Sequence, residues 1–240
     1  MTPSFKPVQR HVYDVLMASG ESATSVRSTE GRRERKKRET RQRISDIATG
    51  LMLERGFNAV TIAEIAESAD VSVNTVYNYF PSKEDLFFDR EEEMTDRPSR
   101  IVRERSPGES AAHALLDRLR EDVTARNIYG GVLEGYDDWL RCVREAPSLM
   151  ARLFLMQQRT ADRLALTLRE ETGAAPGDPV PEIVADQLVH ACNAVFRMTT
   201  RSIAQGMPPE EVVRDALHRI DVFESLVTGE FLNYAVRSGG

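Results

Sequence analysis

The sequence has few of the residues that stabilise small secreted proteins or anchor proteins in membranes. It contains two cysteines in 240 residues, Cys142 and Cys192, too few for a disulfide framework and without a C-x-x-C pair. Its uninterrupted apolar runs extend over a few residues, whereas a membrane-spanning helix needs about 20. The N-terminus does not develop the apolar core of a signal peptide. We therefore expect a cytoplasmic protein whose thiols stay reduced.

Aromatic residues are also scarce, at 7% of the chain. Leu, Ala, Glu, Arg and Met recur more often than runs of Val, Ile and Thr, a balance that favours helix over sheet. With 240 residues and 41% hydrophobic residues, the chain is long enough to bury the cores of two domains. The composition therefore predicts an all-α protein with two domains.

The net charge of −6 is unevenly distributed. Residues 1–88 carry 13 Lys and Arg against 12 Asp and Glu, while the remainder carries 19 against 26. Within the first part, residues 32–43 contain eight basic residues and two glutamates. Such a basic block favours contact with a polyphosphate. It is also typical of a solvated, charged approach to a helix, so the block alone does not decide between these readings.

Directly after the basic block, the pattern predicts three short helices in a compact region. Apolar residues at 44, 47, 48, 51 and 52 have the spacing of a helix with one buried stripe. Thr61 and Glu64 form a capping box that begins a second helix, and Ser72 caps a third. Asp70 lies at the sharp turn between them, where a left-handed backbone is required and Asp tolerates it. Two short helices joined by a tight turn form a helix-turn-helix.

The second helix of this motif has the chemistry of a DNA-reading element. Val76 and Phe80 are four residues apart and face the core, which turns the intervening polar and aromatic side chains outward. Amides, hydroxyls and methyl groups are the groups that read base edges in the major groove. Tyr79 and Lys83 lie towards the end of the helix, where a phenol and an ammonium would meet backbone phosphates.

The acidic remainder reads as further helices separated by Pro and Gly. We expect one helix from Ser82 that Pro98 ends or kinks, and another after Gly108. A break at Tyr129-Gly130-Gly131 precedes a short segment with Trp139, and a long helix opens at Pro147. The last two helices are the most regular. Their apolar stripes are Val184, Leu188, Ala191, Val195 and Met198, and Val213, Ala216, Leu217, Ile220, Phe223 and Val227. We expect the last helix to have a second apolar side, formed by Val212, Leu226 and Phe231, that a partner subunit would cover.

One stretch of the chain resembles the N-terminal signature of the TetR family of transcriptional regulators. The similarity is carried by Thr61-Ile62-Ala63-Glu64-Ile65-Ala66, by Ala69-Asp70-Val71-Ser72, and by Thr75-Val76-Tyr77-Asn78-Tyr79-Phe80-Pro81-Ser82-Lys83-Glu84-Asp85-Leu86. It covers about residues 40 to 88. The sequence departs from the family at Asp70, where a Gly is usual, and in a longer N-terminal arm.

The resemblance implies three segments with different roles along the chain. Residues 1–38 would form a flexible N-terminal arm with the basic block, 39–88 a helix-turn-helix domain that binds double-stranded DNA, and 89–240 an effector-binding domain that makes a homodimer through its last two helices. Carried over by position, Val73, Asn74, Thr75 and Tyr77 lie near bases, and Thr61, Asn78, Tyr79 and Lys83 near phosphates. The basic block is placed to reach a neighbouring groove, adding affinity more than specificity.

The resemblance also implies a small-molecule pocket among the helices from about residue 110 to 205. Large or polar residues there are candidates to line it: Tyr129, Tyr136, Trp139, Phe154, Gln157, His190, Asn193 and Met198. Aromatic and Met residues at helical spacing are also typical of ordinary core packing. The neighbouring polar pair His190 and Asn193 is either a ligand handle or a hydrogen-bonded pair within the fold.

The function that these observations favour is a transcriptional regulator, most simply a repressor that a small molecule releases from a palindromic operator. A regulator or activator without an effector is the alternative. An all-α enzyme is the rival class, but the sequence has none of the zinc-protease, serine-nucleophile or phosphate-loop motifs. The four histidines lack metal-ligand spacing, so we expect neither a metal nor another cofactor.

Overall fold

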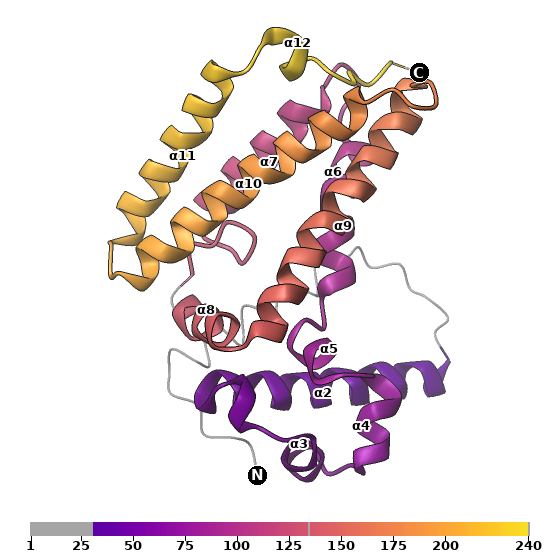
Figure 1. The fold of residues 1–240 in the computed structure, drawn as a ribbon, viewed down its shortest axis with the longest axis vertical. Coiled ribbons are helices and arrows are strands. Elements are labelled where there is room, and N and C mark those ends of the chain that lie inside the picture. Colours follow the sequence, from indigo (N-terminus) through magenta and orange to yellow (C-terminus); the bar gives the residue numbers. More distant parts are fainter. Residues whose placement is uncertain (1–30, 134, 240) are drawn as a thin grey trace. The chain divides into compact units, whose positions relative to one another are not determined.

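The computed structural model describes residues 31–133 and 135–239, and every regular element in these ranges is helical (Figure 1). This confirms the all-α fold. The helices are α2 (Arg32–Arg55), η1 (Phe57–Ala59), α3 (Ile62–Ser68), α4 (Val73–Tyr79), α5 (Lys83–Phe87), α6 (Glu91–Glu104), α7 (Ala111–Thr124), α8 (Tyr136–Glu145), α9 (Pro147–Thr172), α10 (Val180–Ala204), α11 (Pro209–Leu226) and α12 (Gly229–Leu232). The tail expected over residues 1 to about 30 lies outside the described residues.

The described chain forms two compact units. The N-terminal unit contains residues 31–89 together with 135–152, and the C-terminal unit contains residues 90–133 and 153–239. The resemblance implies a DNA-binding domain that ends at residue 88. Helix α8 lies beyond that residue and follows α7 in the chain, but it buries its apolar side in the N-terminal unit.

Helix α2 begins at Arg32 rather than near residue 40. Residues 32–38, expected in a flexible arm, are therefore helical, and this part of the expectation is corrected. Arg, Lys and Glu are good helix formers. The Thr40 hydroxyl donates to the Lys36 carbonyl at 2.9 Å, and Arg35 lies 3.7 Å from Glu39 one turn further along. The apolar stripe therefore does not mark the start of α2, because helical turns that are exposed to solvent need no apolar side chains.

The helix-turn-helix forms as its local signals predict. The Thr61 hydroxyl accepts from the Glu64 amide while the Glu64 carboxylate accepts from the Thr61 amide, which completes the capping box. Asp70 takes a φ of 51°, in the left-handed region that the turn requires. The Ser72 hydroxyl accepts from the Thr75 amide at 3.0 Å and begins α4. These three interactions fix α4 on a core that includes the fully buried Val76 and Phe80.

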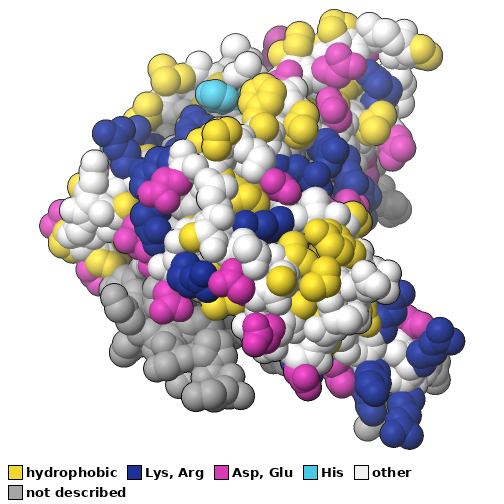
Figure 2. Space-filling view, turned by 60° about the horizontal axis from the view of Figure 1, so that its bottom comes forward, with side chains coloured by type: hydrophobic (Ala, Val, Ile, Leu, Met, Phe, Trp, Pro, Cys, Tyr) yellow, Lys and Arg dark blue, Asp and Glu magenta, His cyan; other side chains and the backbone are white. Residues whose placement is uncertain are grey.

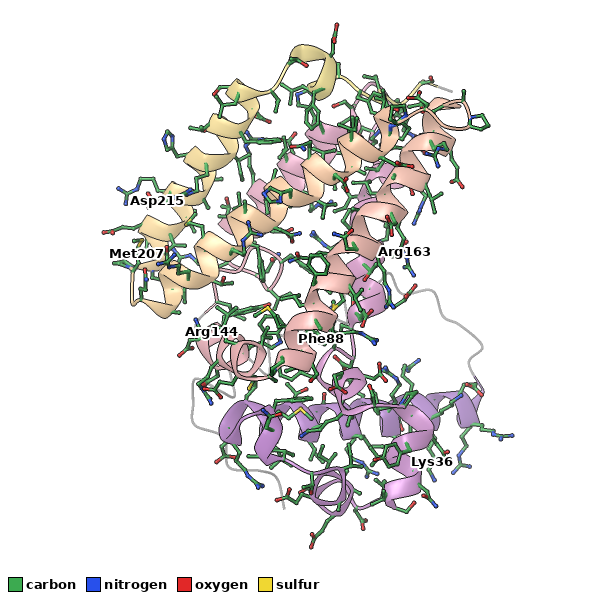
Figure 3. All side chains as sticks on the ribbon, in the orientation of Figure 1. Lys36, Phe88, Arg144, Arg163, Met207 and Asp215 are labelled. Atoms are coloured by element: carbon green, nitrogen blue, oxygen red, sulfur yellow. The ribbon has the colours of Figure 1, made fainter. Side chains whose placement is uncertain are left out.

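Helix α8 belongs to the N-terminal unit because its aromatic side chains meet those of α5. The Trp139 ring stacks on that of Phe87 at 5.7 Å, and Phe88, labelled in Figure 3, meets Trp139 edge-on at 6.0 Å. Tyr136 completes the cluster, with its ring 5.2 Å from Trp139. On the same helix, the Cys142 thiol donates to the Met52 carbonyl of α2 at 3.1 Å. Cys142 is fully buried, and burial raises the pKa of its thiol.

The segment around Pro98 differs from the expected single helix. The chain from Ser82 forms two helices, α5 and α6, and Pro98 lies inside α6. A proline in a helix interior removes one backbone hydrogen bond. Thr95, Ser99 and Val102 on the same helix are buried, so the packing of α6 in the C-terminal unit offsets that loss.

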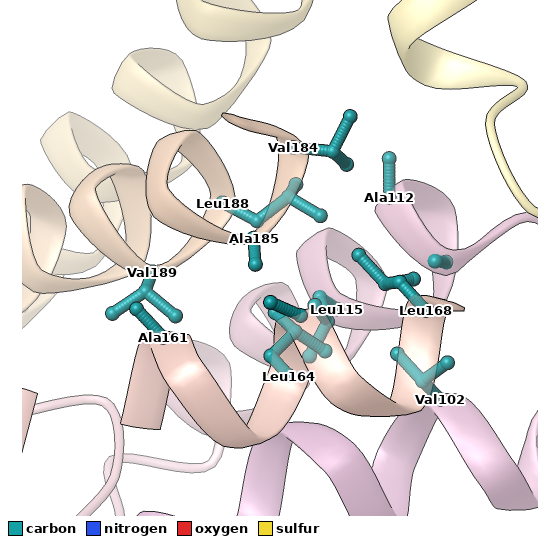
Figure 4. Close-up of a cluster of buried hydrophobic side chains, with 12 residues drawn as sticks. Val102, Ala112, Leu115, Ala161, Leu164, Leu168, Val184, Ala185, Leu188 and Val189 are labelled. Atoms are coloured by element: carbon teal, nitrogen blue, oxygen red, sulfur yellow. The ribbon is translucent and has the colours of Figure 1, made fainter. Parts of the chain in front are cut away.

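The C-terminal unit is built around small and branched aliphatic side chains from α6, α7, α9 and α10 (Figure 4). A second cluster joins α7, α10 and α11. The predicted break at Gly130-Gly131 is confirmed and has a steric cause. A Cβ on Gly131 would lie 2.5 Å from the Thr199 hydroxyl oxygen, and that hydroxyl donates to the Gly130 carbonyl at 2.8 Å.

The last two helices follow their predicted stripes, with Val184, Leu188 and Ile220 buried. The sequence also suggested a second apolar side of the C-terminal helix, formed by Val212, Leu226 and Phe231. The structure corrects this set. Val212 is fully buried in the core, and Phe231 lies on α12, where its ring meets that of Phe223 at 6.1 Å. Leu226 alone of the three is widely exposed, at 78%.

Candidate DNA-binding surface and C-terminal groove

The exposed side of α4 presents the side chains that the sequence placed near bases. Val73 is 39% exposed and Tyr77, one turn further along, is 50% exposed. Asn74 is also exposed, and so, one turn further along, is Asn78, which the resemblance placed near phosphates. Two aromatic or aliphatic groups and two amides therefore share one helical face. Thr75 is half-buried, and its hydroxyl lies 2.8 Å from that of Ser72, so it contributes to the cap.

The residues placed near phosphates flank this face. Thr61 is exposed at the start of α3, although its hydroxyl donates to Glu64 at 2.8 Å. Tyr79 is half-buried at the end of α4. The Lys83 ammonium lies 4.4 Å from the centre of the Phe57 ring, and partial burial lowers its pKa. A cation held over an aromatic ring is fixed in position, which suits a single phosphate contact. The roles of all eight residues remain predictions.

An ion pair that sequence reasoning missed supports the start of α3. Arg55, at the end of α2, donates to the Glu64 carboxylate at 2.8 Å. This hydrogen bond, together with those from Thr61, lowers the pKa of Glu64 from 4.5 to about 2. A nine-residue separation between the partners gives no periodic signal, so only the fold could reveal the pair.

Glu64→Gln is expected to flatten the acid limb of the stability profile. Because the folded-state pKa lies below the ordinary value, the carboxylate contributes stability above about pH 4.5, and this contribution is lost as the pH falls towards about 2. Thermal unfolding of wild type and variant across this range measures the effect. Glu54→Gln, at an exposed position on α2, is the control. An unchanged profile in Glu64→Gln would contradict a stabilising role for the pair.

Six of the effector-pocket candidates are divided between the two units: Tyr136, Trp139, Phe154, Gln157, His190 and Asn193. Tyr136 and Trp139 lie in the N-terminal unit, within the aromatic cluster with Phe87 and Phe88. The other four lie in the C-terminal unit. Of these, Phe154 is 60% exposed and His190 is exposed, while Gln157 and Asn193 are half-buried. Packing within the N-terminal unit therefore accounts for the first two, and the pocket assignment of the set remains a prediction.

The C-terminal unit contains a polar network that the sequence did not indicate. Arg97 donates to the buried Asp122 carboxylate at 2.6 Å and lies 4.0 Å from the centre of the Tyr129 ring. The Tyr129 hydroxyl donates to Glu93 at 2.6 Å. Burial is the main cause of the raised pKa of Tyr129. The network joins α6 to α7 and to the loop after it. Arg163 on α9, labelled in Figure 3, adds an ion pair to Glu92 at 2.7 Å.

An open groove of about 600 Å³ lies in the C-terminal unit along α10 and α11. Its walls are mostly apolar and include Ala194, Val222 and Leu226, with His218 and Arg219 among the polar residues. Val222 is 40% exposed and Leu226 is 78% exposed. The groove therefore lies on a helix pair with an uncovered apolar surface.

In the described residues, no helix is both long and apolar enough to cross a membrane. The same residues contain no group of three or more His, Cys, Asp or Glu side chains arranged to hold a metal ion.

A helix-turn-helix with an exposed, hydrogen-bonding second helix, followed by a helical unit, defines a DNA-binding regulator. The family model for bacterial regulatory proteins of the tetR family matches residues 44–89. The regulator TcmR of Streptomyces glaucescens is 30% identical over 166 residues, which cover 65% of this chain and 73% of TcmR. The chain therefore belongs to the TetR family of transcriptional regulators. This assignment agrees with the expectation of a regulator rather than an enzyme.

Other relatives support the same assignment over different lengths. The repressor KstR of Mycolicibacterium smegmatis is 42% identical over 67 residues, or 25% of this chain and 33% of KstR. Among solved structures, NalD, the secondary repressor of a multidrug efflux pump in Pseudomonas aeruginosa, has a TM-score of 0.52 at 19% identity, covering 81% of this chain and 99% of NalD. A SmeT–triclosan complex has a TM-score of 0.52 at 18% identity, covering 80% of this chain and 94% of SmeT. These structural likenesses concern the fold.

Proposed function

We propose that this TetR-family regulator is a homodimeric repressor that binds a near-palindromic operator through α4 and is released by a small molecule bound in its C-terminal unit. The observation that carries the DNA-binding role is the exposed face of α4. Val73, Asn74, Tyr77 and Asn78 point away from a core in which Val76 and Phe80 are buried. Exposed amides and aromatic groups on a rigid helix are suited to reading base edges in the major groove.

The uncovered surface of α10 and α11 supports the homodimer. Leu226 exposes 78% of its surface and borders a mostly apolar groove. A leucine gains about 1.5–3 kcal/mol when it is fully buried, and a second copy of the same helix pair would cover it. Two such pairs make a four-helix interface with two-fold symmetry. Two recognition helices related in this way read half-sites about one DNA turn, or a multiple of it, apart.

The names of relatives support repression and an effector. KstR is named a transcriptional repressor, and the SmeT structure holds triclosan. For the present chain, the effector is tested by titrating a panel of small apolar compounds, triclosan among them, into the protein–operator complex. Saturable release of the DNA is expected for at least one compound. A compound that binds the C-terminal unit without changing operator affinity would argue for regulation without that effector.

Asn74→Ala and Lys83→Ala are expected to weaken DNA binding in different ways. Loss of a base-reading amide should cost about 1–3 kcal/mol on the operator and little on unrelated DNA. Loss of a phosphate contact should weaken binding to all sequences and reduce the salt slope by about 1. Salt titrations on a duplex selected by the wild-type protein and on an unrelated duplex separate the two effects. Unchanged operator binding in both variants would exclude α4 as the recognition helix.

A further inference from the structure

The basic block forms the first three turns of α2, the helix whose later turns build the core of the N-terminal unit. Ile44, Ala48 and Met52 of α2 are fully buried, whereas residues 31–39 are all exposed. In Figure 1 the indigo N-terminal end of α2 extends past α4. Dark-blue Lys and Arg side chains gather at a projecting end of the surface in Figure 2. The family model begins only at residue 44, so these turns lie outside the part of the chain that it describes.

One row of the block points to the same side of α2 as its contact with α4. The Arg41 guanidinium lies 4.5 Å from the centre of the Phe80 ring, at the residue that ends α4. It also donates to the Asp89 carbonyl at 3.4 Å. Lys37 and Arg33 precede Arg41 by one and two steps of four residues, so they continue this row. At a rise of about 1.5 Å per residue, they lie about 6 and 12 Å further along the helix axis.

These cations have no function in the fold that the structure reveals. Neither Lys37 nor Arg33 makes an ion pair within the described residues, in contrast to Arg35, which pairs with Glu39. Like charges four residues apart destabilise a helix, and cations near a helix N-terminus oppose the helix dipole. A row of this kind is unfavourable in the isolated protein and becomes favourable beside a polyanion.

We propose that Arg33 and Lys37 form a second DNA contact, which binds backbone phosphates just outside the half-site read by α4. The inference rests on the proposed DNA-binding role of α4. Duplex DNA is the favoured polyanion because the row starts at Arg41, whose contact with Phe80 ties it to the end of the recognition helix. The contact adds affinity to every sequence, since phosphates carry no base identity. It also acts from a rigid helix, so its position on the DNA is fixed relative to α4.

The test compares two double variants of the full-length protein that remove the same charge. Arg33→Ala/Lys37→Ala removes the row. Lys36→Ala/Arg43→Ala removes two basic residues that are seven positions apart and lie on the side of α2 opposite Arg41. Alanine preserves helix propensity in both, and circular dichroism with thermal unfolding checks that each variant folds. The probe is a duplex selected from a randomised pool by the wild-type protein.

The row variant should lower the slope of log affinity against log salt by about 2 per bound subunit. Since each phosphate contact contributes a slope of about 0.9, its affinity at about 0.1 M salt should fall roughly 60-fold for each bound subunit. In the control variant, the slope of log affinity against log salt should decrease by less than half as much as in the row variant. Hydroxyl-radical footprinting should show that only the row variant loses protection of the phosphates flanking the half-site. Arg33→Lys/Lys37→Arg should retain both the slope and the footprint.

Equal losses in the two double variants would show that only total charge matters and would overturn the proposal, as would no loss in either. Loss of binding to phosphatidylglycerol vesicles in the row variant, with DNA binding unchanged, would assign the row to a membrane surface instead. Failure of the proposed DNA-binding role gives a different result, because Asn74→Ala would then leave operator binding intact.

Discussion

Leu226→Arg is expected to convert the dimer to a monomer and to abolish tight operator binding. The side chain is 78% exposed in the protomer, so the protomer should fold with its stability changed by less than about 0.5 kcal/mol. In the two-fold dimer the substitution acts twice. Loss of two buried leucines costs about 3–6 kcal/mol of association free energy, and two desolvated guanidinium groups add to that cost.

Sedimentation velocity and operator titrations on the same samples measure the two consequences. Leu166→Arg is the matched control, because Leu166 on α9 is 54% exposed but lies outside the helix pair of the proposed interface. It should remain a dimer with wild-type affinity. A wild-type monomer that binds its operator tightly would contradict the proposed dimer, since one half-site supplies too few contacts.

Trp139→Ala is expected to destabilise the N-terminal unit by about 1–3 kcal/mol. The half-buried ring stacks on Phe87 and contacts Phe88 and Tyr136, so its removal takes away the aromatic contacts between α5 and α8. Operator affinity should fall with stability, because α5 directly follows the recognition helix. Urea unfolding measures the loss of stability. It is monitored by far-ultraviolet circular dichroism, because this signal reports helix content and does not depend on Trp139.

Phe154→Ala is the control for Trp139→Ala. Both residues were candidates for the effector pocket, but Phe154 is 60% exposed in the C-terminal unit. Its removal should change stability by less than about 0.5 kcal/mol. Equal stability of the Trp139→Ala variant and wild type would show that α8 does not support the DNA-binding unit. A loss of effector response without a loss of stability would return Trp139 to the pocket.

The helix-turn-helix was predictable because each of its signals acts over a few residues. The capping box of Thr61 and Glu64, the turn at Asp70 and the cap at Ser72 join groups within three residues of one another. Such groups meet whenever the chain turns into a helix, whatever surrounds it. The apolar stripes of α10 and α11 were predictable for a related reason. A helix that packs against a core must carry apolar residues at the helical period of about 3.6 residues.

Other features depended on contacts between distant parts of the chain. The sequence could not assign α8 to the N-terminal unit, because an amphipathic helix shows which side is buried but not which partner buries it. For the same reason Val212 looked like part of a second surface and is in fact core. The start of α2 at Arg32 left no apolar signal, since a solvated helix buries nothing.

The sequence by itself therefore determined the helical class, the recognition motif and the family, all of which rest on short-range patterns. Tertiary structure alone decided which way the basic residues of α2 face. Arg41 meets Phe80, 39 positions later in the chain, and this contact orients the row that contains Lys37 and Arg33. The sequence shows which residues are charged, but the packing of the helix that carries them decides which way their side chains point.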